Sequence, residues 1–95
     1  MKKRKKYTPE EKARLNGINT AQYIALDTME ENMEENRHYM MLQYRDALDE
    51  YAELIERGKT THRDNYQDFN LQEIYLKSKA NEYLRLVKYY EQKIA

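Results

Sequence analysis

The sequence predicts an all-α protein: an antiparallel helical hairpin, coiled-coil-like, with a short N-terminal helix, pairing into a dimeric helical bundle. Residues 20–57 contain neither proline nor glycine. The apolar residues of this stretch fall on one face of a helix with about 3.6 residues per turn. From residue 69 onward, apolar residues recur at alternating steps of four and three, which is the heptad spacing of helices that pack together.

The first seven residues are predicted to form a disordered basic arm. Its five consecutive positive charges repel one another unless a partner neutralises them: Lys2, Lys3, Arg4, Lys5 and Lys6. The same charges give the arm its one predicted activity, which is salt-sensitive binding to the phosphates of nucleic acid. A disordered arm that only increases solubility is the alternative interpretation.

A short helix is predicted over about residues 9–16. Thr8 is a good N-cap, Pro9 suits the first helical position, and Glu11 completes a capping box. Gly17 is expected to end this helix, because glycine weakens a helix interior; a single bent helix that continues through Gly17, at a cost of about 1 kcal/mol, is the alternative. A new helix can then start from a cap at residue 19 or 20.

The long first arm of the hairpin is predicted as one helix over about residues 20–57. It includes a tetrapeptide written twice, Met-Glu-Glu-Asn at 29–32 and again at 33–36. A period of four keeps both methionines on the apolar face. That face is formed by Met29, Met33, Met40, Tyr44, Ala47, Tyr51 and Ile55. Gly58 is expected to end the helix.

The second arm of the hairpin has two candidate starts and one clear end. Thr61 with Asp64 can cap a helix that starts near residue 64, and Asn70 with Glu73 can cap one that starts near residue 70. Either helix runs to about residue 94. The heptad positions are Phe69, Leu76, Ala80, Tyr83, Val87, Tyr90 and Ile94. Residues 8–95 are therefore predicted to be a single domain.

Six apolar residues are candidates for binding a partner. In an antiparallel hairpin the second helix ends opposite about residue 30, so the segment before it has no partner within the chain. Four candidates lie on that uncovered segment: Ile18, Tyr23, Ile24 and Leu26. Tyr39 and Leu42 lie on the face of the long helix opposite to its apolar stripe. Tyrosine is enriched at protein-binding hot spots, and this chain has ten tyrosines and no tryptophan.

The composition argues against catalysis. Without cysteine there is no thiol nucleophile or thiolate metal site, and Ser78 is the only serine. Glu35 and His38 have the Glu-x-x-His spacing of di-metal helical bundles, but the helical wheel points both toward solvent. We therefore expect no enzyme activity, metal, cofactor or small-molecule substrate.

These observations predict a non-enzymatic interaction protein. Its expected partners are a second copy of itself and another, unidentified protein, which it binds or inhibits. Small size and plain composition suit a regulator of host machinery encoded by a phage or other mobile element. The alternatives are a dimer that binds nucleic acid through the basic arm and a structural coiled-coil unit. No apolar run is long enough to span a membrane, so a cytoplasmic protein is expected.

Overall fold

The computed structural model describes residues 6–58 and 66–94, with the backbone alone at residues 66–68. It contains three helices: α1 (Pro9–Asp27), α2 (Met33–Gly58) and α3 (Tyr66–Ile94). The predicted all-α class is therefore confirmed, and no strand occurs within the described ranges. Nor does any helix in these ranges have the length and apolar character that a membrane crossing requires. The predicted arm at residues 2–5 and the caps Thr61 and Asp64 lie outside the described residues.

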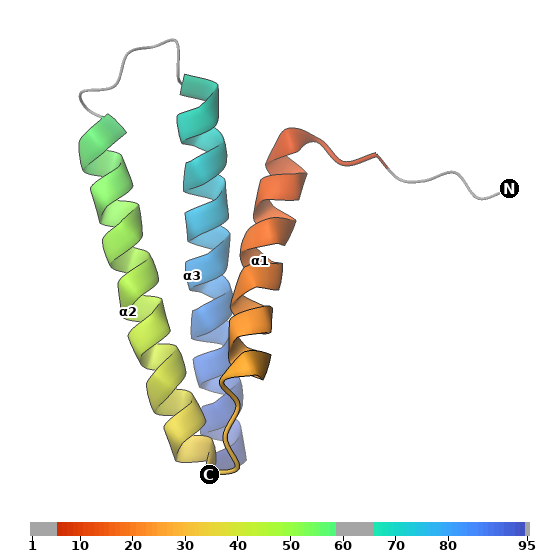
Figure 1. Cartoon of the computed structure of the whole chain (residues 1–95), viewed down its shortest axis with the longest axis vertical. Helices are drawn as coiled ribbons and strands as arrows, with labels where there is room; N and C mark the ends of the chain where they lie inside the picture. Colours follow the sequence, from red (N-terminus) through yellow and green to blue (C-terminus); the bar gives the residue numbers. More distant parts are fainter. Residues whose placement is uncertain (1–5, 59–65, 95) are drawn as a thin grey trace, which may run out of the picture.

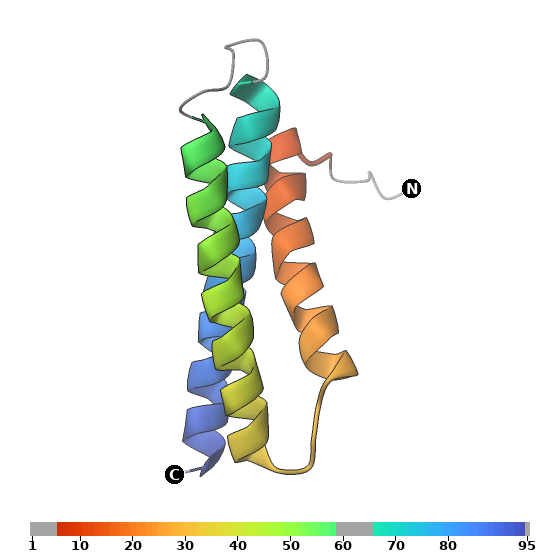
Figure 2. The ribbon, with the colours of Figure 1, turned by 60° about the vertical axis from the view of Figure 1, so that its left-hand side comes forward.

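Helix α3 lies between the other two helices (Figure 1). It runs antiparallel to α2 and parallel to α1, and it packs extensively against both (Figures 1 and 2). It begins at Tyr66, between the two predicted starts, so Asn70 is a residue of the helix rather than its cap. Helix α2 ends at Gly58, one residue after the predicted end.

The start of α1 is as predicted, but its end is not. Thr8 is the N-cap, where its Oγ1 accepts a hydrogen bond from the Glu11 backbone N–H at 3.1 Å, and Pro9 follows at the first helical position. The helix then continues through Gly17 to Asp27, so the predicted break at Gly17 is wrong. An ideal Cβ built on Gly17 would lie 2.4 Å from the Tyr75 carbonyl oxygen on α3. Glycine is therefore needed here for close packing between helices, not to end one.

The chain breaks instead at residues 28–32, which we call the hinge. The predicted continuous helix over 20–57 is therefore wrong. Asn32 caps α2, because its Oδ1 accepts hydrogen bonds from the backbone N–H groups of Glu34 at 2.8 Å and Glu35 at 3.4 Å. The two copies of Met-Glu-Glu-Asn thus have different conformations: residues 29–32 lie in the hinge, and residues 33–36 form the first turn of α2.

Asn36 holds the hinge in place. This side chain is only 3% exposed, and its amide binds both backbone polar groups of Glu30. The Oδ1 atom accepts from the Glu30 N–H at 2.7 Å, and the Nδ2 atom donates to the Glu30 carbonyl at 2.9 Å. The buried Asn36 side chain therefore supplies the backbone hydrogen bonds that Glu30 would make in a continuous helix.

The core lies where α3 meets its two neighbours. Between α2 and α3 it contains large side chains of the predicted stripes, such as Met40 and Tyr83, together with Leu54, which was not on the predicted stripe. Helix α1 instead presents three small residues at a spacing of four, Gly17, Ala21 and Ala25, which are buried. The buried hydrophobic residues are Ala21, Ala25, Met40, Ala47, Leu54, Leu76, Ala80, Tyr83, Val87 and Tyr90. The prediction that the segment before residue 30 lacks a partner within the chain is wrong, because α1 folds back onto α3.

Candidate interaction surface

At four places in the chain a tyrosine is followed three residues later by a leucine, and these pairs differ in how deeply they are buried. A spacing of three places both side chains on one face of a helix. Leu54 and Tyr83, from the pairs at 51/54 and 83/86, are buried in the core. The pair on α1 is the opposite case: Tyr23 is 71% exposed and Leu26 is 70% exposed. We call these two residues the α1 outer pair.

The α1 outer pair contains the two most exposed of the large hydrophobic side chains that the structure describes. Both residues lie on the side of α1 away from the buried residues Ala21 and Ala25. Met29, just beyond the helix end, is 52% exposed. An exposed aromatic and an exposed aliphatic side chain side by side are typical of a protein-binding surface.

The other predicted contact residues are spread over three different surroundings. Ile18 and Ile24 are half-buried, and Ile24 packs against the core cluster. Tyr39 and Leu42 on α2 are exposed by 37% and 43%. The structure therefore keeps Tyr23 and Leu26 together as an exposed surface and does not gather all six predicted residues into one.

An open, acidic pocket of about 850 Å³ lies beside the hinge. Its lining comes from the end of α1, the hinge and the first turns of α2: Asp27, Thr28, Glu30, Asn32, Glu34, Glu35, Arg37, His38 and Tyr39. Glu35 and His38, the pair with di-metal spacing, are both exposed here. Within the described residues no three His, Cys, Asp or Glu side chains are arranged to hold a metal ion.

Polar contacts fix the position of α1 on α3. Glu82 is buried, and it accepts hydrogen bonds from Gln22 Nε2 on α1 at 2.9 Å and from Arg85 Nε at 2.9 Å. The hydrogen bond from Arg85 lowers the pKa of the Glu82 carboxyl, against the opposing effect of burial, and the bond from Gln22 lowers it further. This carboxylate therefore connects the two helices in its charged form.

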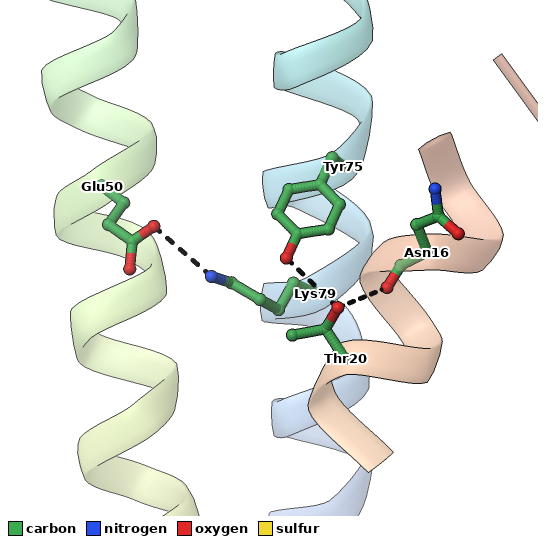
Figure 3. A network of polar contacts seen from close by, with 5 residues as sticks. All are labelled: Asn16, Thr20, Glu50, Tyr75 and Lys79. Atoms are coloured by element: carbon green, nitrogen blue, oxygen red, sulfur yellow. Dashed lines mark hydrogen bonds and ion pairs between the residues drawn. The ribbon is translucent and has the colours of Figure 1, made fainter. Parts of the chain in front are cut away.

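A second polar contact joins α1 and α3 near their middle (Figure 3). The Tyr75 hydroxyl lies 3.2 Å from Thr20 Oγ1, and the Thr20 hydroxyl donates to the Asn16 carbonyl at 2.7 Å. From the same stretch of α3, Lys79 Nζ reaches Glu50 on α2 at 3.4 Å. The outer face of α1 is thus presented by a helix whose inner face is held by both packing and hydrogen bonds.

Two tyrosines in the core have raised pKa values for the same reason. Burial raises the pKa of Tyr83 to about 12, with smaller contributions from nearby acidic groups such as Glu50. Burial also raises the pKa of Tyr90. Both belong to the hydrophobic core, so these shifts reflect packing.

The sequence interpretation missed Asn36, Gln22 and Glu82. Asn36 and Glu82 are buried and Gln22 is exposed, and none of the three belongs to the apolar pattern from which the helices were predicted. Asn32 had a readable signal, because Asn32 and Glu35 have the spacing of an N-cap and the acidic residue three positions later. Of the predicted nucleic-acid-binding arm, Lys6 is described and exposed, and the rest lies outside the described residues.

Comparison of the chain with protein-family models, with curated proteins and with solved structures gives no match.

Proposed function

We propose that this chain is a non-enzymatic protein–protein interaction module, a small helical homodimer that binds or inhibits another macromolecule through the α1 outer pair. The observation that carries the proposal is the exposure of Tyr23 and Leu26 at 71% and 70% on one face of α1. A regulator of host machinery carried by a phage or other mobile element is the class that the chain's size and plain composition favour.

The energetics support a binding role for this pair. Fully burying a leucine side chain contributes about 1.5–3 kcal/mol, and tyrosine is among the residues most often found at binding hot spots. Helix α1 is already held against α3, so little order has to be gained when a partner binds. A preformed surface of this kind loses less affinity to conformational entropy than a flexible one.

The groups with shifted pKa values fit a structural role. Glu82 connects α1 to α3 through Gln22 and is paired with Arg85, and Tyr83 and Tyr90 are packed in the core. Each shift has a structural cause already described, which supports a non-enzymatic function. The same contacts keep the outer face of α1 in place.

Nucleic-acid binding through the basic arm is the second candidate. The observation that favours it is the run of five consecutive cations at residues 2–6, in a chain whose formal net charge is zero. Such a charged segment binds phosphates without reading sequence. A structural coiled-coil unit is the third candidate, favoured by the heptad spacing of α3.

Affinity capture from the native host tests the proposal. The wild-type chain is compared with a variant carrying Tyr23→Ser and Leu26→Ser, each with and without nuclease. A variant carrying Leu48→Ser and Tyr89→Ser is the matched control, because it removes an exposed leucine and an exposed tyrosine elsewhere. We expect nuclease-resistant partners with the wild type and the control, and their loss with the Tyr23/Leu26 variant.

Two outcomes would contradict the proposal. Equal capture by all three proteins would remove the α1 outer pair as the binding surface, and capture that nuclease abolishes would favour the nucleic-acid alternative. Thermal unfolding of each variant shows whether a loss of binding comes from a loss of folding. Because Tyr23 and Leu26 are mostly exposed, their replacement should leave the melting temperature close to that of the wild type.

A further inference from the structure

The hinge contains nothing that forbids a helix. Between Gly17 and Gly58 the chain has no glycine or proline, and the hinge sequence Met29–Asn32 is identical to the helical sequence Met33–Asn36. The break is maintained by side chains instead: Asn32 caps α2, and Asn36 binds the backbone of Glu30. Two asparagines, Asn32 and Asn36, therefore stabilise a non-helical conformation in a five-residue segment that has helical preference.

Met29 indicates what the alternative conformation would gain. It is 52% exposed in the hinge. In a helix that continued through the hinge, Met29 would lie one turn before Met33 and on the same face as Met40. Met40 is buried in the core, and Met33 packs against the core. The apolar pattern of α2 therefore includes Met29 in the sequence, but in the observed conformation Met29 does not pack with the other residues of that pattern.

Helix α1 can also separate from the rest of its own chain as one intact helix. Its tertiary contacts are made mainly with α3, and it packs far less against α2. Those contacts include Gly17 against the Tyr75 backbone and the hydrogen bond from Gln22 to Glu82. None of them requires α1 and α3 to belong to the same copy of the chain.

We propose that the hinge straightens so that α1 and α2 become one continuous helix, and that α1 then docks on α3 of a second copy. The dimer is thus formed by exchange of α1. A continuous helix from residue 9 to residue 58 would be about 75 Å long. This inference rests on the homodimer in the proposed function and supplies its geometry, while leaving Tyr23 and Leu26 on the outside of α1.

The direction of the helices agrees with this exchange. In the observed chain α1 runs parallel to α3, and α2 runs antiparallel to it (Figure 1). After straightening, α1 runs in the direction of α2. A two-fold axis perpendicular to the helices at the hinge reverses the second copy, so its α3 is parallel to the incoming α1. The contacts at Gly17, Thr20 and Gln22 can therefore re-form between copies in the same parallel sense.

Two substitutions shift the hinge in opposite directions. Asn36→Leu removes both hydrogen bonds to Glu30 and adds an apolar side chain near the α2 stripe, so it favours the continuous helix. Met33→Pro favours the observed break, because proline suits the first position of α2 but interrupts a helix that runs through it. Met33→Ala is the matched control, since it removes the same side chain and permits both conformations.

Light scattering during size-exclusion chromatography measures the effect on mass. We expect the Asn36→Leu variant to dimerise with an association constant at least about tenfold above that of the wild type. The Met33→Pro variant should stay near 11.7 kDa at concentrations where the Met33→Ala variant approaches twice that mass. Equal association of the proline and alanine variants would overturn the exchange, as would an Asn36→Leu variant that associates no more than the wild type.

Cross-linking shows which copy supplies α1. The chain has no cysteine, so Gln22→Cys can be placed in one copy and Glu82→Cys in another, differently tagged copy. The two chains are refolded together and treated with a short bismaleimide. We expect a cross-link between the two tagged chains, and a chain carrying both cysteines gives the reference for linkage within one copy.

The outcomes separate this inference from the proposed function. A dimer by mass without cross-links between copies would overturn the exchange and leave a homodimer of another geometry. A strictly monomeric wild type and Asn36→Leu variant would contradict both the exchange and the homodimer. Partner capture that depends on Tyr23 and Leu26 would survive either result.

Discussion

Gly17 on α1 touches the backbone of Tyr75 on α3: the Cβ of any other residue at position 17 would lie 2.4 Å from the Tyr75 carbonyl oxygen and 2.9 Å from the Lys79 backbone nitrogen. Real Cβ atoms do not approach backbone atoms so closely. The contact brings α1 near enough for Ala21 and Ala25 to be buried as well. The missing side chain at Gly17 is therefore what allows α1 to cover α3.

Replacing Gly17 should consequently destabilise the fold. Gly17→Ala would gain about 1 kcal/mol in helix propensity, but the clash with the α3 backbone forces the helices apart. We expect a net loss of about 1–3 kcal/mol in the free energy of unfolding, measured by urea denaturation. Asn19→Ala, on the exposed side of the same helix, is the control and should be neutral or slightly stabilising. An increase in stability for Gly17→Ala would show that the contact is loose.

Glu82 should make the protein sensitive to acid. Its pKa is lowered in the folded state, so its contribution is present above the ordinary carboxyl pKa and is lost as the pH falls through the lowered value. We expect Glu82→Gln to lower the free energy of unfolding by about 1–2 kcal/mol at pH 7. The gap between wild type and variant should close as the pH is lowered below about 4.5. The exposed Glu91→Gln is the control, and a gap that stays constant with pH would contradict this role for Glu82.

Tyr83 should make the protein sensitive to alkali. Its pKa is raised from 10.0 to about 12 in the folded state, so its contribution is complete below pH 10 and is lost as the pH rises toward 12. The loss amounts to at most about 3 kcal/mol. The unfolding free energy of the wild type should therefore fall relative to that of Tyr83→Phe over this range. Tyr23→Phe controls for the removal of an exposed phenol, and an unchanged difference for Tyr83→Phe would count against its burial.

The basic arm is predicted to bind nucleic acid through charge alone. Deleting residues 2–6 should then abolish retention on DNA. With five cations, the logarithm of the binding constant should fall against the logarithm of salt concentration with a slope of about −4.5. Replacing the four lysines of the arm by arginine keeps the charge and should keep the binding. Retention that survives the deletion would exclude the arm as the contact.

The sequence was sufficient for the helical class, the start of α1 and most of the large core side chains, but Leu54 was not on the predicted stripe, and Met29 and Ile94, which were, are exposed. Thr8 and Pro9 determine the first turn of α1 through local chemistry, and local chemistry is readable from sequence. Tyr83 and Val87 lie in the core because heptad spacing places them on one face of α3.

The position of the break was not predictable in the same way. Propensity alone places it at Gly17, but packing against Tyr75 makes glycine favourable inside α1. The true break depends on Asn36, whose hydrogen bonds join residues six positions apart and follow no helical period. At Gly17 a contact with a distant helix outweighs local preference, and at the hinge two hydrogen bonds across six positions do so.

The binding surface was predicted in part, and for a reason that the structure corrects. A two-helix hairpin predicts that Tyr23 and Leu26 lie on a segment without a partner within the chain. Helix α1 does have one, but it packs through the small residues Ala21 and Ala25, which carry little weight in an apolar stripe. The two large residues are exposed because they lie on the other face of a packed helix.

Photo-cross-linking at position 23 tests the proposed binding surface most directly. A photoreactive phenylalanine derivative replaces Tyr23 in the native host, and the same derivative at Leu48 on α2 serves as the control. We predict that irradiation links the protein at position 23 to a specific partner, that position 48 gives no such product, and that Leu26→Ser abolishes the link. Irradiation that gives no product at position 23, or the same products at both positions, would contradict a binding role for the α1 outer pair.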